Sequence, residues 1–139
     1  MLPTAYCLLL FPSPQPLNLM YSDQVLNHFH HPRNVGELEQ ATVVVETTNP
    51  VCGDLMKLWA LVQDGVIVDV TFKVAGCVPA VACGSWLTER IKGTRLAALP
   101  RVTSDQIAAG LGGLPPASKH AAALAYEALQ QLLAIAVNR

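Results

Sequence analysis

The sequence has few of the features that mark membrane, secreted or nucleic-acid-binding proteins. Its 139 residues contain no apolar run near the roughly 18 residues that a membrane-spanning helix needs. The net charge is −1, so a basic surface for nucleic acid is not expected. There are only four cysteines, widely spaced and without a Cys-x-x-Cys pair, which does not fit the dense disulfide framework of a small secreted domain. These absences favour one globular domain with reduced thiols, and we expect a cytoplasmic location.

The first 19 residues differ from the rest of the chain. The apolar run at residues 6–11 is followed by closely spaced prolines, and no Lys or Arg precedes it as in a signal peptide. The arginines of a mitochondrial presequence are also missing. We interpret residues 1–19 as a disordered extension, with Met20 a second candidate start, and residues 20–139 as the domain. Cys7 lies in the extension and is assigned no role.

After the extension, the apolar pattern predicts a helix, three strands and further helices. Ser22 is a good helix N-cap, and Pro32 ends the first helix near His31. The strands are predicted at Thr42–Thr48, Leu55–Gln63 and Val66–Val74, and the later helices at Val81–Ile91, Leu96–Leu99, from Thr103 or Ser104 to Ala109, and beyond Pro116. This order predicts an α+β fold, a three-stranded antiparallel β-meander with α-helices packed on one face.

The turn at Asp64-Gly65 joins the second and third strands. A two-residue turn would pair Gln63 with Val66 and place the apolar faces of the two strands on opposite sides of the sheet. A turn of odd length restores a common face. We therefore expect a three-residue turn with Gly65 at a bulge, and Val66 and Val68 facing the core.

Four side chains with metal-binding chemistry lie where these elements begin or end. Cys52 and Asp54 lie in the break before the second strand, Cys77 follows the third strand, and His120 lies at the head of the last helix. Cys52 and Asp54 continue the core-facing series of the second strand, where a lone carboxylate is costly to bury. Two thiolates, an imidazole and a carboxylate suit tetrahedral zinc. Thiolates with histidine also hold iron–sulfur clusters.

Taken singly, each of these residues also has an ordinary structural explanation. Cys77 could be a packed thiol, His120 a helix-start or core histidine, and Asp54 a partner of loop amides. Cys83 lies inside a predicted helix and is best explained as a small packing residue. His28 and His31 could share a helix face. No thiol or carboxylate is placed to complete a site with them, so solvated or capping histidines are favoured.

Several motifs, in order along the chain, resemble one protein family. They are His31-Pro32-Arg33-Asn34-Val35-Gly36, Pro50-Val51-Cys52-Gly53-Asp54, Gly76-Cys77, and Leu114-Pro115-Pro116 with His120. The domain resembles the U-type iron–sulfur cluster assembly scaffolds, namely IscU, SufU and the N-terminal domain of NifU, and it is most like the IscU type.

The resemblance implies a function and a set of partners. A scaffold of this family is not an enzyme. It receives sulfur as persulfide from a cysteine desulfurase, binds iron, holds a transient [2Fe-2S] cluster and passes it to recipient apoproteins. Carried over, the site residues are Cys52, Asp54, Cys77 and His120, and zinc could occupy the same site. The family's third cysteine should follow His120, where this chain has Ala121.

This departure leaves alternatives open. Cys83, at a position where relatives carry serine, is a candidate substitute thiol. In the stretch where chaperone-served relatives have Leu-Pro-Pro-Val-Lys, the lysine is displaced to Lys119, which leaves an Hsp70-type chaperone partner open. A degenerate relative that binds only zinc or iron, as a regulatory or interaction module of a cysteine desulfurase system, is a second possible function. A thiol enzyme with His120 as base to Cys52 or Cys77 is the third.

Overall fold

The structure is a computed structural model that describes residues 17–51 and 53–137. Its elements, in chain order, are α2 (Leu17–Met20), α3 (Asp23–His30), β1 (Val43–Thr48), β2 (Leu55–Gln63), β3 (Val66–Ala75), α4 (Val78–Ile91), the 3₁₀ helix η1 (Leu96–Arg101), α5 (Ser104–Gly110), the 3₁₀ helix η2 (Pro116–Ser118) and α6 (Lys119–Val137). Most of the expected extension, including Cys7, lies outside the described residues, and the last three residues of 1–19 belong to α2. No helix in the described part of the chain is long and apolar enough to cross a membrane.

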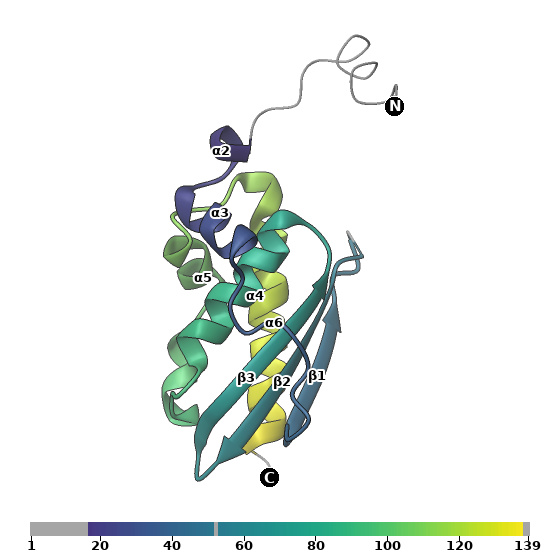
Figure 1. Cartoon of the computed structure of the whole chain (residues 1–139), viewed down its shortest axis with the longest axis vertical. Helices are drawn as coiled ribbons and strands as arrows, with labels where there is room; N and C mark the ends of the chain where they lie inside the picture. Colours follow the sequence, from purple (N-terminus) through teal and green to yellow (C-terminus); the bar gives the residue numbers. More distant parts are fainter. Residues whose placement is uncertain (1–16, 52, 138–139) are drawn as a thin grey trace.

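The three strands form one antiparallel sheet in the order β1-β2-β3. Helix α6 packs against β1 and β2, and α4 packs against β3, so both helices cover one face of the sheet (Figure 1). The α+β meander predicted from the sequence is confirmed. The core forms where Leu58 and Phe72 of the sheet meet Leu87 of α4 and Leu129 of α6, all of them buried. Since one face of α6 is buried along the length of the helix, the helix fixes the position of its first turn relative to the sheet.

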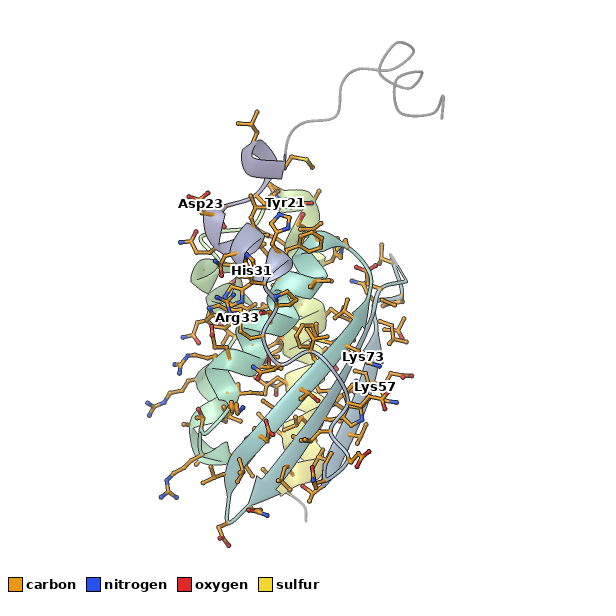
Figure 2. The ribbon with its side chains drawn as sticks, in the orientation of Figure 1. Tyr21, Asp23, His31, Arg33, Lys57 and Lys73 are labelled. Atoms are coloured by element: carbon orange, nitrogen blue, oxygen red, sulfur yellow. The ribbon has the colours of Figure 1, made fainter. Side chains whose placement is uncertain are left out.

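The opposite face of the sheet carries charged side chains (Figure 2). Lys57 and Lys73 are direct cross-strand partners, an arrangement that like charges normally disfavour. Each lysine has a separate compensating contact. The Nζ of Lys73 lies 3.2 Å from Glu37 Oε2, and the Nζ of Lys57 lies 5.1 Å from the centre of the Trp59 ring. Each positive charge is therefore partly offset on this face of the sheet.

The turn between β2 and β3 is not the one expected from the sequence. Gln63 pairs with Val66, so the turn has two residues, Asp64 and Gly65, with φ of 53° and 75°. Two left-handed residues are the signature of the type I′ hairpin turn. The extra residue lies further along, where the register shifts between Leu61 and Val62 of β2.

This bulge in β3 restores the common apolar face that the sequence argument required. Leu61 pairs with Asp69 and Val62 pairs with Ile67, so Val68 is the unpaired residue. Ile67 is consequently buried, whereas Val68 is 42% exposed. The expectation that Val66 and Val68 face the core was wrong. The residues of β3 that face the core change from odd to even positions at the bulge within the strand, and not at the turn.

Helix α3 is held on α4 by polar contacts as well as by Val25 in the core. Its N-cap is Ser22, as predicted, whose Oγ accepts from the Val25 N–H at 3.1 Å. His28 was expected to be solvated or capping. It is instead buried, with Nδ1 2.7 Å from Ser85 Oγ, while His31 is the exposed C-cap residue. The buried histidine belongs to a helix–helix contact.

Candidate metal centre

Three segments far apart in sequence meet at one end of the sheet (Figure 1). They are the loop between β1 and β2, the end of β3 where it turns into α4, and the start of α6. They bring together Asp54, Cys77 and His120, whose ligand atoms all lie within 4.8 Å of one another. Three of the four predicted site residues are therefore one group. The fourth, Cys52, lies outside the described residues.

The loop that carries Asp54 is closed by Asn49. The Asn49 N–H donates to the Asp54 carbonyl at 2.8 Å, and the Asn49 carbonyl accepts from the Gly53 N–H at 2.8 Å. The Asn49 side-chain oxygen also accepts from the Val51 N–H at 2.8 Å. Gly53, with φ of 78°, supplies the left-handed residue that the loop needs before β2 begins. The sequence analysis did not identify Asn49 as a residue that builds the site. An asparagine directly before proline and ahead of a Cys-Gly-Asp run was the available signal.

Cys77 is the N-cap residue of α4. Its backbone is extended, with φ of −90° and ψ of 173°, and Pro79 occupies the first turn of the helix. Its side chain makes no capping bond, so the thiol is free to turn toward the loop, where Sγ donates to Asp54 Oδ2 at 3.2 Å. Burial raises the pKa of the Cys77 thiol, and the hydrogen bond and charge of Asp54 raise it further, against the lowering effect of the Ala80 N–H.

His120 is the second residue of α6. The 3₁₀ turn η2 (Pro116–Ser118) leads directly into the helix, and the Ser118 N–H donates to the Pro115 carbonyl at 2.8 Å. One turn further along α6, Leu124 is buried against the sheet. The histidine thus lies half-buried at the mouth of a helix whose next turn is anchored in the core, which holds its ring close to Asp54 and Cys77.

The residue after His120 adds no ligand. Ala121 is fully buried in the first turn of α6. Cys83, the candidate substitute thiol, is also fully buried, and its burial together with the nearby Cys77 thiol raises its pKa to about 12. Among the described residues, the group of possible ligands contains Asp54, Cys77 and His120 and does not include Cys83.

The chemistry of the group fits a borderline or soft metal ion. It offers one sulfur, one nitrogen and one oxygen ligand, and the carboxylate also accepts the thiol proton in a hydrogen bond. Such a mixed set suits zinc in a tetrahedral site and iron in a cluster with some non-cysteine ligands. A metal that displaces the Cys77 proton would place a positive charge beside the Asp54 carboxyl.

Comparison with known proteins identifies the family. The model of the NifU-like N-terminal domain matches residues 20–137. The chain belongs to this family. The U-type resemblance inferred from the motifs is therefore confirmed.

Relatives and solved structures agree with this assignment. The chain is 44% identical over 114 residues to the iron–sulfur cluster assembly scaffold protein IscU 1 of Archaeoglobus fulgidus, covering 82% of this chain and 74% of the relative. It is 39% identical over 120 residues to the scaffold protein IscU of Haemophilus influenzae, covering 84% and 94%. A NifU-like N-terminal structure from Brucella abortus shares the fold, with a TM-score of 0.70 at 16% identity over 85% of this chain and 94% of that one. The fold is also shared by a crystal structure from Fervidobacterium islandicum, described as a candidate iron–sulfur cluster assembly scaffold protein for the SUF system. The TM-score is 0.71 at 21% identity, over 85% of this chain and 99% of that one.

Proposed function

We propose that this protein is a scaffold on which an iron–sulfur cluster is assembled and from which it is passed to recipient apoproteins. The observation that carries the proposal is the group formed by Asp54, Cys77 and His120 in a NifU-like domain. Its relatives in Archaeoglobus fulgidus and Haemophilus influenzae are named as iron–sulfur cluster assembly scaffolds. These names describe scaffolds, not enzymes, and we assign no reaction turned over by the chain itself.

The proposed ligands are Cys52, Asp54, Cys77 and His120. Cys52 is included because it stands two residues before Asp54 in the sequence, where the family's motif carries its first cysteine. Four protein ligands are the number that a [2Fe-2S] cluster takes. The cluster is cargo in this scheme, built from Fe²⁺ and from persulfide sulfur that a cysteine desulfurase delivers and that an external electron donor, such as a thiol or a reduced ferredoxin, reduces to sulfide.

The mixed ligand set suits transient binding. Only two of the four proposed ligands are thiolates, and Ala121 leaves the position after His120 without one. Ligand identity sets both the affinity and the reduction potential of a cluster. Iron binds carboxylate and imidazole ligands less tightly than thiolates. A cluster bound by this mixed set should therefore be released readily. Because thiolates are needed, we place the protein in a reducing, cytoplasmic environment, with the desulfurase and the recipient apoproteins as its partners.

The alanine at position 121, where the family has a cysteine, also favours a second function. With sulfur, nitrogen and oxygen donors and no cysteine at Ala121, the site also fits a single zinc or iron ion. The chain would then be a regulatory or interaction module of a desulfurase system and would not build clusters.

Anaerobic reconstitution separates the two functions. The chain is incubated with Fe²⁺, cysteine, a cysteine desulfurase and a thiol reductant that converts persulfide sulfur to sulfide, and the desalted product is examined by visible absorption and by iron and sulfide analysis. A scaffold should show the charge-transfer bands of a cluster and equal amounts of iron and sulfide, and should then activate an apo-ferredoxin. A product that retains zinc, carries no sulfide and activates nothing would establish the second function instead.

A further inference from the structure

We propose that Gly76 is a positioning residue of the metal centre, because the space where its side chain would lie is the space that the Asp54 carboxyl occupies. The inference rests on the proposed metal site, although it holds equally for zinc and for a cluster. It assigns to the residue before Cys77 a role in setting the ligand geometry.

The geometry at Gly76 is close. A Cβ added to Gly76 would lie 2.7 Å from Asp54 Cγ, 2.8 Å from Oδ2 and 3.1 Å from Cβ. The first two separations are shorter than non-bonded atoms adopt, and the third is tighter than most real contacts. The backbone gives no other reason for glycine here, since Gly76 is not among the residues with positive φ. The absence of a side chain at Gly76 thus leaves room for the Asp54 carboxyl.

The side chain of Asp54 is the part that can yield. The backbone of Asp54 is held by the Asn49 N–H at 2.8 Å, and Gly76 lies between the end of β3 and the N-cap of α4. Neither backbone can move without disturbing the sheet or the helix. A methyl group at Gly76 would therefore turn the Asp54 carboxyl to another rotamer, which breaks its bond to Cys77 Sγ at 3.2 Å. The fold would survive this change, but the ligand group would not.

Loss of the Asp54 carboxyl from the ligand group should weaken metal binding more in this chain than in a chain with a spare ligand. Among the described residues, the group of possible ligands is Asp54, Cys77 and His120, and Ala121 provides no replacement for one that is lost. Gly76 therefore determines whether the set is complete.

Gly84, on α4, provides a matched control. A Cβ there would lie 2.5 Å from two ring carbons of Phe72, a fully buried side chain in the core. Alanine at position 76 would thus clash with the metal centre, whereas alanine at position 84 would clash with the core. Gly84→Ala should lower the melting temperature while the folded protein still binds metal normally.

The test is a double-mutant cycle of Gly76→Ala and Asp54→Ala, with Gly84→Ala as control. The first measurement is titration of the apo chain with Zn²⁺ and Co²⁺. We expect Gly76→Ala and Asp54→Ala each to weaken binding by roughly 10- to 100-fold, with the double variant no weaker than Asp54→Ala alone. The melting temperature of apo Gly76→Ala should stay close to that of the original chain.

The second measurement is this melting temperature, compared with that of Gly84→Ala. Additive losses in the double variant, or a drop in melting temperature like that of Gly84→Ala, would each overturn the proposal. Because neither readout requires a cluster, failed cluster reconstitution would leave this inference intact while removing the proposed scaffold function.

Discussion

Two thiols on α4 have opposite environments although they are six positions apart in the sequence. Cys77 caps the helix, is partly exposed, and donates a hydrogen bond to Asp54. Cys83 lies in the middle of the helix, is fully buried in the core, and has a pKa raised to about 12. The difference indicates that a thiol is available to a metal ion only where several segments converge on it. The number of cysteines alone does not indicate how many ligands a site has.

The largest predicted effect comes from removing the two thiols separately. Cys77→Ala should lower zinc affinity by about 100-fold or more and abolish cluster formation, because it deletes a thiolate from a set without a spare. Cys83→Ala should leave both unchanged, because its thiol packs in the core. The measurement is metal content after desalting, with circular dichroism to show that both variants are folded. Loss of metal from Cys83→Ala would give that residue the substitute role that its burial disfavours.

A smaller effect is expected from adding a thiol. Ala121→Cys places sulfur beside His120 in the first turn of α6, and we expect about tenfold better metal retention together with a higher cluster yield. Ala122→Cys, at a neighbouring buried position, is a matched control for the added thiol. Equal yields from the two variants would show that the position after His120 has no special access to the site.

Cys83→Ser tests the core thiol by its chemistry. A buried hydroxyl without a partner should cost about 1–3 kcal/mol in the free energy of unfolding, measured with urea. The zinc affinity of the folded protein should stay the same. If the hydroxyl caused no loss of stability, the packing role assigned to Cys83 would be wrong.

The smallest predicted effect concerns a titrating group away from the site. Burial between α3 and α4 lowers the pKa of His28, and Arg33 lowers it further, against the opposing charge of Glu89. Because the folded pKa lies below the unfolded value of about 6.5, the unfolded chain takes up protons first. The contribution of His28 to stability is therefore complete above that value and decreases as pH falls below it.

Urea unfolding at pH 5.0 and 7.5 measures this contribution. The difference between the two pH values should be smaller in His28→Gln than in the original chain. The zinc affinity of the variant at pH 7.5 should match the original, because His28 contacts Ser85 and lies outside the ligand group.

The sequence predicted the strands, the fold class and the convergence of Asp54, Cys77 and His120, because strand ends and helix starts limit where these residues can lie. It did not predict the position of the bulge in β3. Val66, Ile67 and Val68 are all β-branched and apolar, so alternation carried no information there. The burial of His28 depends on Ser85 of another helix, and the closeness of Gly76 to Asp54 depends on how two loops pack. Neither the burial of His28 nor the closeness of Gly76 to Asp54 can be predicted from the spacing of residues along the sequence.

The meeting of three distant segments has a consequence for folding. An ion bound by Asp54, Cys77 and His120 would tie the start of β2, the start of α4 and the start of α6 together and would act as a removable cross-link. Asp54 and Cys77 alone are 23 residues apart, and closing such a loop costs chain entropy that a bound ion offsets only in the folded state. Loading with metal should therefore slow amide exchange along β2 and α6, far beyond the ligands themselves, and delivery of the cargo should restore that mobility.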